Sequence, residues 1–293
     1  MPHYGHGTAI TISISILTKI SGCNKIILIR RLAMLKEKPV ILSISALDSS
    51  ALRGVEADVK TALKLNTYCT VATTCVTSQN TQRCISRLAL SSSMVYDQIK
   101  AASEDFRIGC VKVGLISNIN QAKAVKDALD KYFNEVPVVL DPVIASKFGH
   151  IYTDAETLDY IKENIFDKVT LLTPNMKEAE TLTEMKVSTV TEMLAAAQKL
   201  HLDYGTSVLI TGGALEGELK DVLVIDGKEK IIDRKRVDRT AFGLGATVST
   251  AIATYLAKGY KMEEAVRFGL EYLQMCLREK TDLGKNEGAI WHI

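Results

Sequence analysis

From Pro39 onward, short apolar segments alternate along the chain with stretches of helical periodicity. The segments expected to form buried strands lie at 40–45, 68–74, 110–116, 136–143, 168–175 and 207–213. The helical patterns lie at 54–66, 92–103, 118–132, 176–184, 189–203 and 262–279. This alternation is typical of an α/β protein with a mainly parallel central sheet flanked by helices. Because no repeat or internal linker interrupts it, we expect one domain over 39–293.

Three local patterns refine this expectation. Within 54–66, one helix face is expected to carry the apolar residues Val55, Val59, Ala62 and Leu63. The second strand is expected to end in a polar loop at 77–80. Asp-Gly is a favoured two-residue hairpin turn, so 226–227 predicts a hairpin within 221–237.

A glycine-bearing turn, Gly243-Leu244-Gly245, runs directly into a helical pattern that stops at Lys258-Gly259. Glycines let consecutive backbone N–H groups point the same way, and a helix start adds its positive dipole end. Together they favour a site for phosphate or a developing anion. A tight turn for close helix packing gives the same pattern, and the turn alone leaves both interpretations open.

Polar residues follow several of the expected strands, at the sheet edge where open parallel sheets bind ligands. Asp141 ends an apolar strand, where a carboxylate can orient Mg²⁺ held mainly by phosphates, or can cap a turn. Glu178 is either a metal partner or an acid that complements a helix dipole. Gln79 offers a donor and an acceptor, suited to an aminopyrimidine edge or to solvent. The other residues at this edge are Asp48, Gly114, Asn175 and Gly212-Gly213.

Composition narrows the class of protein. With 293 residues and 47% hydrophobic content, the chain can bury one large core. A net charge of +2 gives no electrostatic case for nucleic acid or an anionic membrane, and no apolar run reaches the roughly 18 residues of a membrane span. Six scattered cysteines without a C-x-x-C pair indicate reduced thiols in a cytoplasmic protein.

Residues 1–38 differ from the rest of the chain. They are rich in Ser and Ile, carry several Lys and Arg, and contain no acid before Glu37. One interpretation is an organellar transit peptide, against which the strand-like alternation at 11–17 counts. The other is an extension, with Met34 placed just before the first expected strand. Neither interpretation predicts a site residue there.

Seven motifs together resemble one family. They are VILSISALDSSALRGVEADVKT (40–61), TSQNT (77–81), VKVGLIS (111–117), VVLDPVIASKFG (138–149), LLTPNMKEAE (171–180), VLITGGALEGE (208–218) and GLGATVSTAIATYLAKGY (243–260). In this order they resemble the hydroxymethylpyrimidine/phosphomethylpyrimidine kinases of thiamine biosynthesis, most closely the fungal ones. The resemblance implies a ribokinase-like fold and commonly a homodimer. It also implies that ATP and Mg²⁺ are used to phosphorylate 4-amino-5-hydroxymethyl-2-methylpyrimidine and then its monophosphate.

The resemblance also implies roles for particular positions. It places the pyrimidine against Asp48, Gln79, Leu115 and Val143. It places Mg²⁺ on Asp141 and Glu178, the nucleotide on Asn175, Thr211 and Gly213, and the anion hole at Gly243 and Gly245.

The chain departs from the family pattern inside this expected site. Ala246 stands where the family has the cysteine presumed to be the catalytic base. Residues 51–53 read Ala-Leu-Arg in place of Gly-Gly-Ala, Ala46 replaces a glycine, and Thr211 replaces a lysine. Three hypotheses follow: a working pyrimidine kinase, a pseudokinase or ligand-binding paralogue, and a kinase for a related vitamin alcohol such as pyridoxal.

Overall fold

The computed structural model describes residues 38–146, 149–217, 219–237, 241–279 and 281–293. Pro39–Ile293 forms one compact unit. The predicted N-terminal extension lies outside the described residues except for Lys38, so that prediction stays untested.

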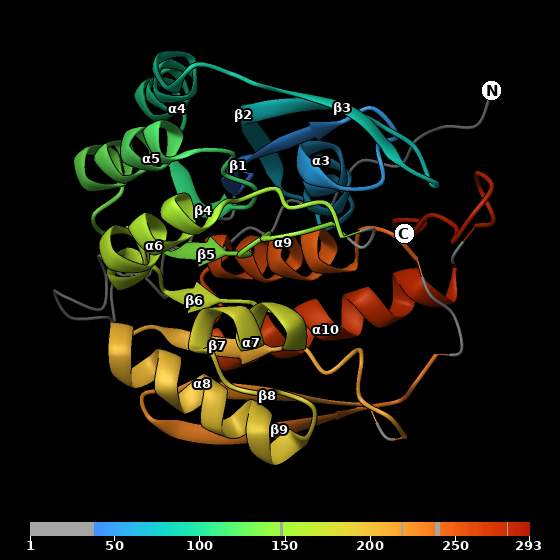
Figure 1. Cartoon of the computed structure of the whole chain (residues 1–293). Helices are drawn as coiled ribbons and strands as arrows, with labels where there is room; N and C mark the ends of the chain where they lie inside the picture. The colour runs from blue at the N-terminus through green and yellow to red at the C-terminus, as the bar shows by residue number, and fades with distance from the viewer. Residues whose placement is uncertain (1–37, 147–148, 218, 238–240, 280) are drawn as a thin grey trace, which may run out of the picture. The chain divides into compact units, whose positions relative to one another are not determined.

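The described strands form one sheet in the order β3-β2-β1-β4-β5-β6-β7-β8-β9 (Figure 1). The parallel strands are β1 (Val40–Asp48), β2 (Tyr68–Gln79), β4 (Ile108–Val113), β5 (Val138–Leu140), β6 (Leu171–Leu172) and β7 (Ser207–Ile210). The antiparallel strands lie at the two edges: β3 (Cys84–Ala89), β8 (Leu219–Ile225) and β9 (Lys228–Arg234). This mainly parallel sheet confirms the predicted fold class, because parallel strands need the helical crossovers that the sequence pattern shows.

Helices cover both faces of the sheet (Figure 1). One face packs against α4 (Ser92–Asp105), α5 (Ile119–Tyr132), α6 (Ala155–Asn164), α7 (Met176–Thr183) and α8 (Val190–Tyr204). The other packs against α3 (Gly54–Lys64), α9 (Leu244–Ala257) and α10 (Met262–Arg278). A short 3₁₀ turn, η1 (Phe166–Lys168), precedes β6. The central strands are mostly apolar on both sides because both faces are covered, with exceptions such as buried Ser43 and Lys112.

The helices differ in how they begin. Helices α4 to α8 each start with a side chain that accepts a hydrogen bond from the first turn: Ser91, Asn118, Asp154, Asn175 and Thr189. Neither α3, after Arg53, nor α9, after Gly243, has such a cap. The first N–H groups of those two helices therefore have no side-chain cap to satisfy them.

Two local predictions are wrong. Residues 77–79 are strand rather than loop, because β3, which the sequence did not suggest, pairs with them as an antiparallel edge. Val59 and Leu63 are exposed, at 38% and 71%, rather than part of the buried face of α3. That face instead includes Asp58, which is fully buried because it pairs with a buried lysine from β4.

Two predicted strands are present but shorter than expected, and the predicted hairpin is present. The strands expected at 136–143 and 168–175 are only three and two residues long, since the chain turns away after Leu140 and Leu172. The hairpin at Asp226-Gly227 is present, with both residues at positive φ. Helix α6 begins after Asp154, between β5 and β6, and was not predicted. Among the described residues, no helix is long and apolar enough to cross a bilayer.

Candidate active site

The carboxyl ends of the parallel strands form a continuous edge that carries most of the predicted site residues. Asp48 pairs with Thr77 across β1 and β2. The Asp141 amide donates to the Val113 carbonyl over 2.8 Å, directly after β5. Beyond β6 and β7, Asn175 and Thr211 form an isolated parallel bridge. The fold thus brings together side chains that are up to 163 positions apart in the chain, counted from Asp48 to Thr211.

Asp48 and Gln79 lie at the ends of β1 and β2 and are linked through Arg53. The Arg53 Nη1 donates to Gln79 Oε1 over 3.1 Å and forms an ion pair of 3.7 Å with Asp48 Oδ2. The Gln79 Nε2 donates to Thr77, and the Tyr152 hydroxyl donates to Gln79 Oε1 over 3.4 Å. The amide is therefore oriented by its neighbours rather than left free in solvent.

Apolar side chains form a wall beside Gln79. Leu115 and Val143 belong to one small cluster with Ala46, Cys75 and Tyr152. Tyr152 therefore contacts both the apolar cluster and the amide of Gln79. This arrangement brings together the predicted substrate-side residues, and it suits a flat ring with a polar edge. Tyr152 was missed because its loop shows no periodicity.

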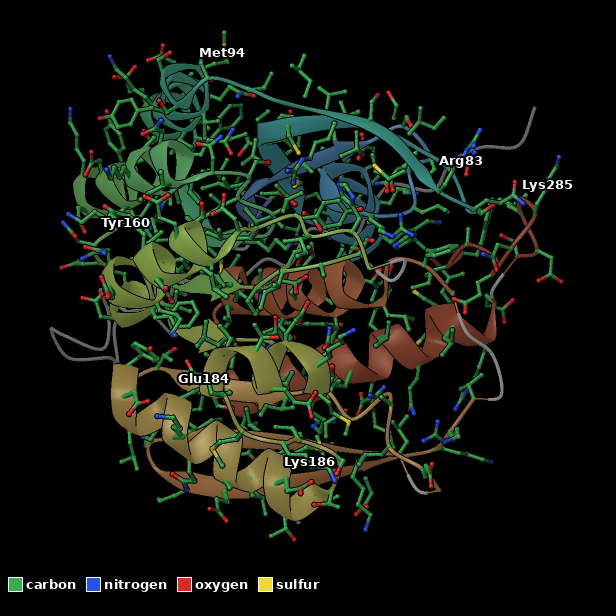
Figure 2. The ribbon with its side chains drawn as sticks, in the orientation of Figure 1. Arg83, Met94, Tyr160, Glu184, Lys186 and Lys285 are labelled. Atoms are coloured by element: carbon green, nitrogen blue, oxygen red, sulfur yellow. The ribbon has the colours of Figure 1, made fainter. Side chains whose placement is uncertain are left out.

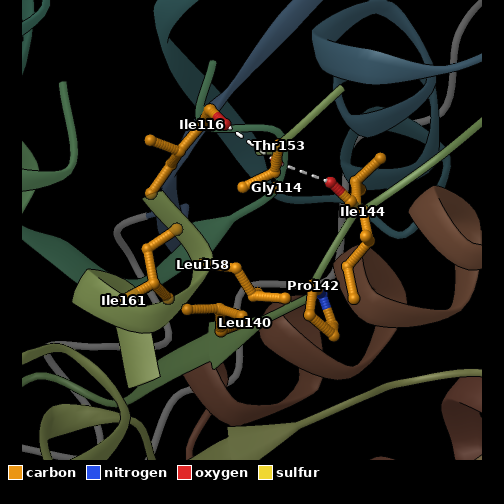
Figure 3. A pocket seen from close by; sticks show the side chains of 9 residues that line it. Gly114, Ile116, Leu140, Pro142, Ile144, Thr153, Leu158 and Ile161 are labelled. Atoms are coloured by element: carbon orange, nitrogen blue, oxygen red, sulfur yellow. Dashed lines mark hydrogen bonds between the residues drawn. The ribbon is translucent and has the colours of Figure 1, made fainter. Parts of the chain in front are cut away.

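A small cavity of about 10 Å³ lies behind this wall, between the ends of β4 and β5 and helix α6 (Figure 3). Its lining is mostly apolar and includes Leu140, Pro142, Ile144 and Leu158. The Thr153 hydroxyl donates to carbonyl groups of Ile116 and Val143. The cavity has room for about one water molecule, so it is not the substrate site.

Asp141 and Glu178 carry the acidic charge of the site. Burial raises the pKa of Glu178 to about 8, and the Asp141 carboxylate adds to this shift. Burial also raises the pKa of Asp141, while the Lys112 charge opposes the rise. Within the described residues Asp141 Oδ1 accepts no hydrogen bond; Oδ2 accepts one from Ser249 at 3.4 Å. Two crowded carboxyl groups of raised pKa fit a divalent cation, which would stabilise their charged forms.

The glycine turn lies directly beside the Asp141 carboxyl group. Gly243 has φ +88°, and a side chain there would collide with the Leu52 carbonyl oxygen. A Cβ on Gly245 would lie 3.3 Å from Asp141 Oδ2. Gly245 itself is exposed at the start of α9, which has no side-chain cap. Ala246 follows in the same first turn and carries no ionisable group.

The predicted nucleotide residues meet at the ends of β6 and β7. Asn175 caps α7 and forms a capping box with Glu178, and Thr211 N donates to the Pro174 carbonyl. Gly213 is exposed, and a Cβ there would meet nothing within 4 Å. A cleft of about 940 Å³ begins beside these residues, between α7 and residues 214–216. That volume is in the range of small-molecule and cofactor sites.

Beneath the site lies a buried polar network that sequence reasoning missed. Lys112 on β4 pairs with Asp58 on α3, and the Ser43 and Thr250 hydroxyls both donate to Asp58. All four residues are at most 1% exposed. A lone lysine in the apolar segment at 110–116 was the available signal, since a buried lysine needs a paired charge.

The C-terminal segment, residues 281–293, contacts both the glycine turn before α9 and the β2–β3 turn. Phe242 bridges to Ala289, and Leu52 packs with both in one apolar cluster. The Lys285 amide donates to Thr81 Oγ1 at the β2–β3 turn over 3.1 Å. Figure 2 shows Lys285 and Arg83 at the same corner of the molecule. The segment thus joins the turn before α9 to the β2–β3 turn.

Comparison with known proteins decides the family. The phosphomethylpyrimidine kinase family matches residues 48–291. The chain belongs to this family. A hydroxymethylpyrimidine/phosphomethylpyrimidine kinase of Mycobacterium bovis is 33% identical over 255 residues, covering 86% of this chain and 93% of that protein. The bifunctional thiamine biosynthesis protein ThiED of Geobacter sulfurreducens is 32% identical over 256 residues. That match covers 86% of this chain but only 52% of ThiED, so this chain spans about half the length of its bifunctional relative.

Solved structures agree with this assignment. A phosphomethylpyrimidine kinase of Clostridium difficile is 32% identical with a TM-score of 0.73, covering 81% of this chain and 99% of that one. A Bacillus subtilis pyridoxal kinase in complex with ADP is 26% identical with a TM-score of 0.79, covering 87% of this chain and 98% of that one. The fold is therefore ribokinase-like, as the resemblance implied. The comparisons give no support to the pseudokinase alternative.

Proposed function

We propose that the protein is an ATP-dependent kinase that phosphorylates 4-amino-5-hydroxymethyl-2-methylpyrimidine and its monophosphate. One observation carries this proposal: in a phosphomethylpyrimidine kinase family member, the Asp141 carboxyl group, which interacts electrostatically with Glu178, adjoins the uncapped start of α9 at Gly245. Phosphoryl transfer depends mainly on positioning and charge stabilisation, and these elements supply both.

In this proposal each part of the site has one task. Gln79 binds the polar edge of the pyrimidine, Leu115 and Val143 pack against its ring, and Asp48 orients Arg53 and the nearby loop. Asn175, Thr211 and Gly213 lie along the nucleotide. The amide groups at Gly243 and Gly245 stabilise the charge on the transferred phosphoryl group. A bond forms between the substrate oxygen and the γ-phosphorus while the bond to ADP breaks.

Asp141 and Glu178 are the residues that would hold Mg²⁺, together with phosphate oxygens of the nucleotide. Bound there, the ion would supply charge that offsets the negative phosphates. Asp141 contributes an open Oδ1, and Ser249 orients its Oδ2.

Single-turnover phosphorylation tests this function. Enzyme in excess over each pyrimidine, with ATP and Mg²⁺, is expected to form ADP and the phosphorylated product, and Asp141→Asn is expected to lose most of this rate. Absence of product at high enzyme concentration would refute the proposal. Pyridoxal belongs in the same panel, since a pyridoxal kinase shares the fold at 26% identity. A preference for pyridoxal would reassign the substrate.

We further propose that two copies associate through the β3 edge. Leu88 and Ile85 on β3 are 68% and 66% exposed, and Val76, which pairs with Leu88, is 37% exposed. An exposed apolar edge strand is an unusual feature in a monomer, because it invites pairing with another chain. This edge is consistent with the homodimer that the resemblance implied.

A further inference from the structure

Arg53 lies where the ring-binding residues meet the glycine turn. Its guanidinium stacks 4.2 Å from the centre of the Phe242 ring and donates to Gln79 Oε1. Phe242 directly precedes Gly243, and the Leu52 carbonyl oxygen lies where a side chain on Gly243 would be. Arg53 therefore borders both the expected pyrimidine and the expected position of phosphate.

The charge of Arg53 is only partly satisfied. Its ion pair with Asp48 Oδ2 is long, at 3.7 Å, and that oxygen is buried without a hydrogen-bond partner in the described part of the chain. Among the described residues, the Nε and Nη2 of Arg53 donate no hydrogen bond. The side chain is 25% exposed, so it remains accessible to a ligand. A guanidinium with two free donor sites matches a phosphate, which it can bind in bidentate fashion.

Ala246 gives an independent indication of which acceptor this site favours. Phosphorylating an alcohol benefits from a base that takes the hydroxyl proton, and Ala246 offers none. Cys75 on β2 is a poor substitute for the missing base, because burial raises the pKa of its thiol. A phosphate monoester is already mostly ionised at neutral pH, with a second pKa of about 6, so its oxygen can attack without a base.

We propose that Arg53 makes this site selective for the pyrimidine monophosphate over the pyrimidine alcohol; this rests on the proposed function. The monophosphate draws the guanidinium from Gln79 Oε1, and the freed amide oxygen accepts a hydrogen bond from the ring amino group. The alcohol lacks a group that compensates for breaking the Arg53–Gln79 bond. The chain is thus specialised for the second phosphoryl transfer, and its substrate comes from a reaction that phosphorylates the alcohol.

Binding measurements on the full chain test this selectivity without requiring turnover. Calorimetry with the alcohol and with the monophosphate is performed on wild type, Arg53→Ala and Arg53→Gln. Wild type is expected to bind the monophosphate more tightly, and both variants are expected to lose about 30-fold or more of that affinity. Their affinity for the alcohol is expected to stay equal or to rise. Arg267→Ala removes the same charge from the exposed face of α10 and is expected to change neither affinity.

The outcomes separate the two proposals. Equal affinities of wild type and both Arg53 variants for the monophosphate, or a wild-type preference for the alcohol, would overturn the role of Arg53 and leave the kinase function standing. If wild type neither binds nor phosphorylates either pyrimidine, the proposed function fails and the selectivity proposal fails with it. Thermal unfolding of each variant verifies that Arg53→Gln, at least, retains the fold.

Discussion

The ammonium group of Lys112 lies 3.1 Å from Asp58 Oδ2, and both side chains are sealed from solvent. The pair joins the sheet to α3, and the Thr250 hydroxyl extends the connection to α9 over 2.6 Å. Ser43 on β1 donates to the same carboxylate. One buried charge pair thus connects β1, β4, α3 and α9. These elements adjoin the expected pyrimidine position and the glycine turn.

We expect Lys112→Met to destabilise the protein by about 3–5 kcal/mol, because it leaves the Asp58 carboxylate buried without its counter-charge. Asp58→Leu is expected to destabilise the protein by a similar amount, because it leaves the Lys112 ammonium group buried without its counter-charge. Urea unfolding followed by circular dichroism measures both. The double variant removes both charges and is expected to be more stable than the sum of the single effects predicts. Additive effects would show that the two groups are not energetically coupled.

Ala246→Cys is expected to raise the rate of alcohol phosphorylation by about 10²-fold, since it adds a base at the start of α9. The helix N-terminus lowers the pKa of a thiol placed there and favours its thiolate. The monophosphate reaction is expected to stay unchanged, because its attacking oxygen is already ionised. Single-turnover kinetics on both substrates measures the two effects.

Ala246→Ser is the matched control for this variant. A hydroxyl has nearly the same size as a thiol but does not ionise near neutral pH, so it is expected to leave both rates near wild type. An equal gain with serine would show that side-chain volume rather than a base limits the reaction. An equal gain on both substrates would contradict the assignment of the base to the alcohol step.

Gly245→Ala tests the space between the glycine turn and the carboxyl groups. Its Cβ would lie 3.3 Å from Asp141 Oδ2, which forces the carboxylate or the helix start to shift. We expect a fall in kcat/KM of about tenfold or more and a higher Mg²⁺ requirement, because small displacements of reacting groups are costly. Stability is expected to hold or to rise slightly, since alanine is the better helix former. An unchanged Mg²⁺ dependence would place the ion elsewhere.

The sequence could predict the sheet and most helices because periodicity reports burial. Strands covered on both faces are mostly apolar, and the crossover helices between them carry a 3.6-residue pattern. Strand β3 escaped prediction because every one of its side chains is at least partly exposed, so it has no buried face to leave a pattern. The buried face of α3 was predicted wrongly for another reason. It includes Asp58, and an aspartate is normally expected on the surface.

The sequence indicated candidate site residues wherever a polar residue or glycine stands at the end of a strand or in a family motif, and their roles stay predictions. Asp141 lies near both Glu178 and Gly245, because it directly follows β5, which pairs with β6 and packs against α9. The sequence did not indicate that Tyr152 and Arg53 contact Gln79, because both contacts are made across loops. Loop conformation is set by tertiary contacts, and a single sequence carries no periodic signal for it.

Leu88→Glu is expected to convert a dimer into a monomer. The change places a charge on the exposed edge strand, where it would be desolvated in an interface, with Val76 as its cross-strand neighbour. Light scattering coupled to size-exclusion chromatography measures the mass. Leu202→Glu is the control, because Leu202 is 79% exposed on α8, which packs against β7 and β8 at the opposite end of the sheet from β3. A wild-type monomer would refute the proposed association, and an equal effect of both variants would place the interface elsewhere.

His292 is expected to make stability depend on pH. The side chain is 8% exposed and its Nε2 lies 3.2 Å from Thr247 Oγ1 on the first turn of α9. Burial lowers the pKa of His292 to about 4, and the charges of Lys60 and Lys64 act in the same direction. The unfolded chain takes up a proton near pH 6.5, whereas the folded chain does so only near pH 4. The stabilising contribution is therefore full above pH 6.5 and is lost as the pH falls towards 4.

His292→Gln removes this titration while keeping a hydrogen-bonding side chain. Urea unfolding from pH 7.5 to 4.5 is expected to show wild type losing about 2 kcal/mol more than the variant over this range. Comparison of the two proteins cancels the titration of the carboxyl groups, which they share. Because His292 contacts the helix that begins with the glycine turn, the kinase rate is expected to fall with stability in wild type below pH 6. Parallel stability curves for the two proteins would show that His292 takes up its proton equally in the folded and unfolded chains.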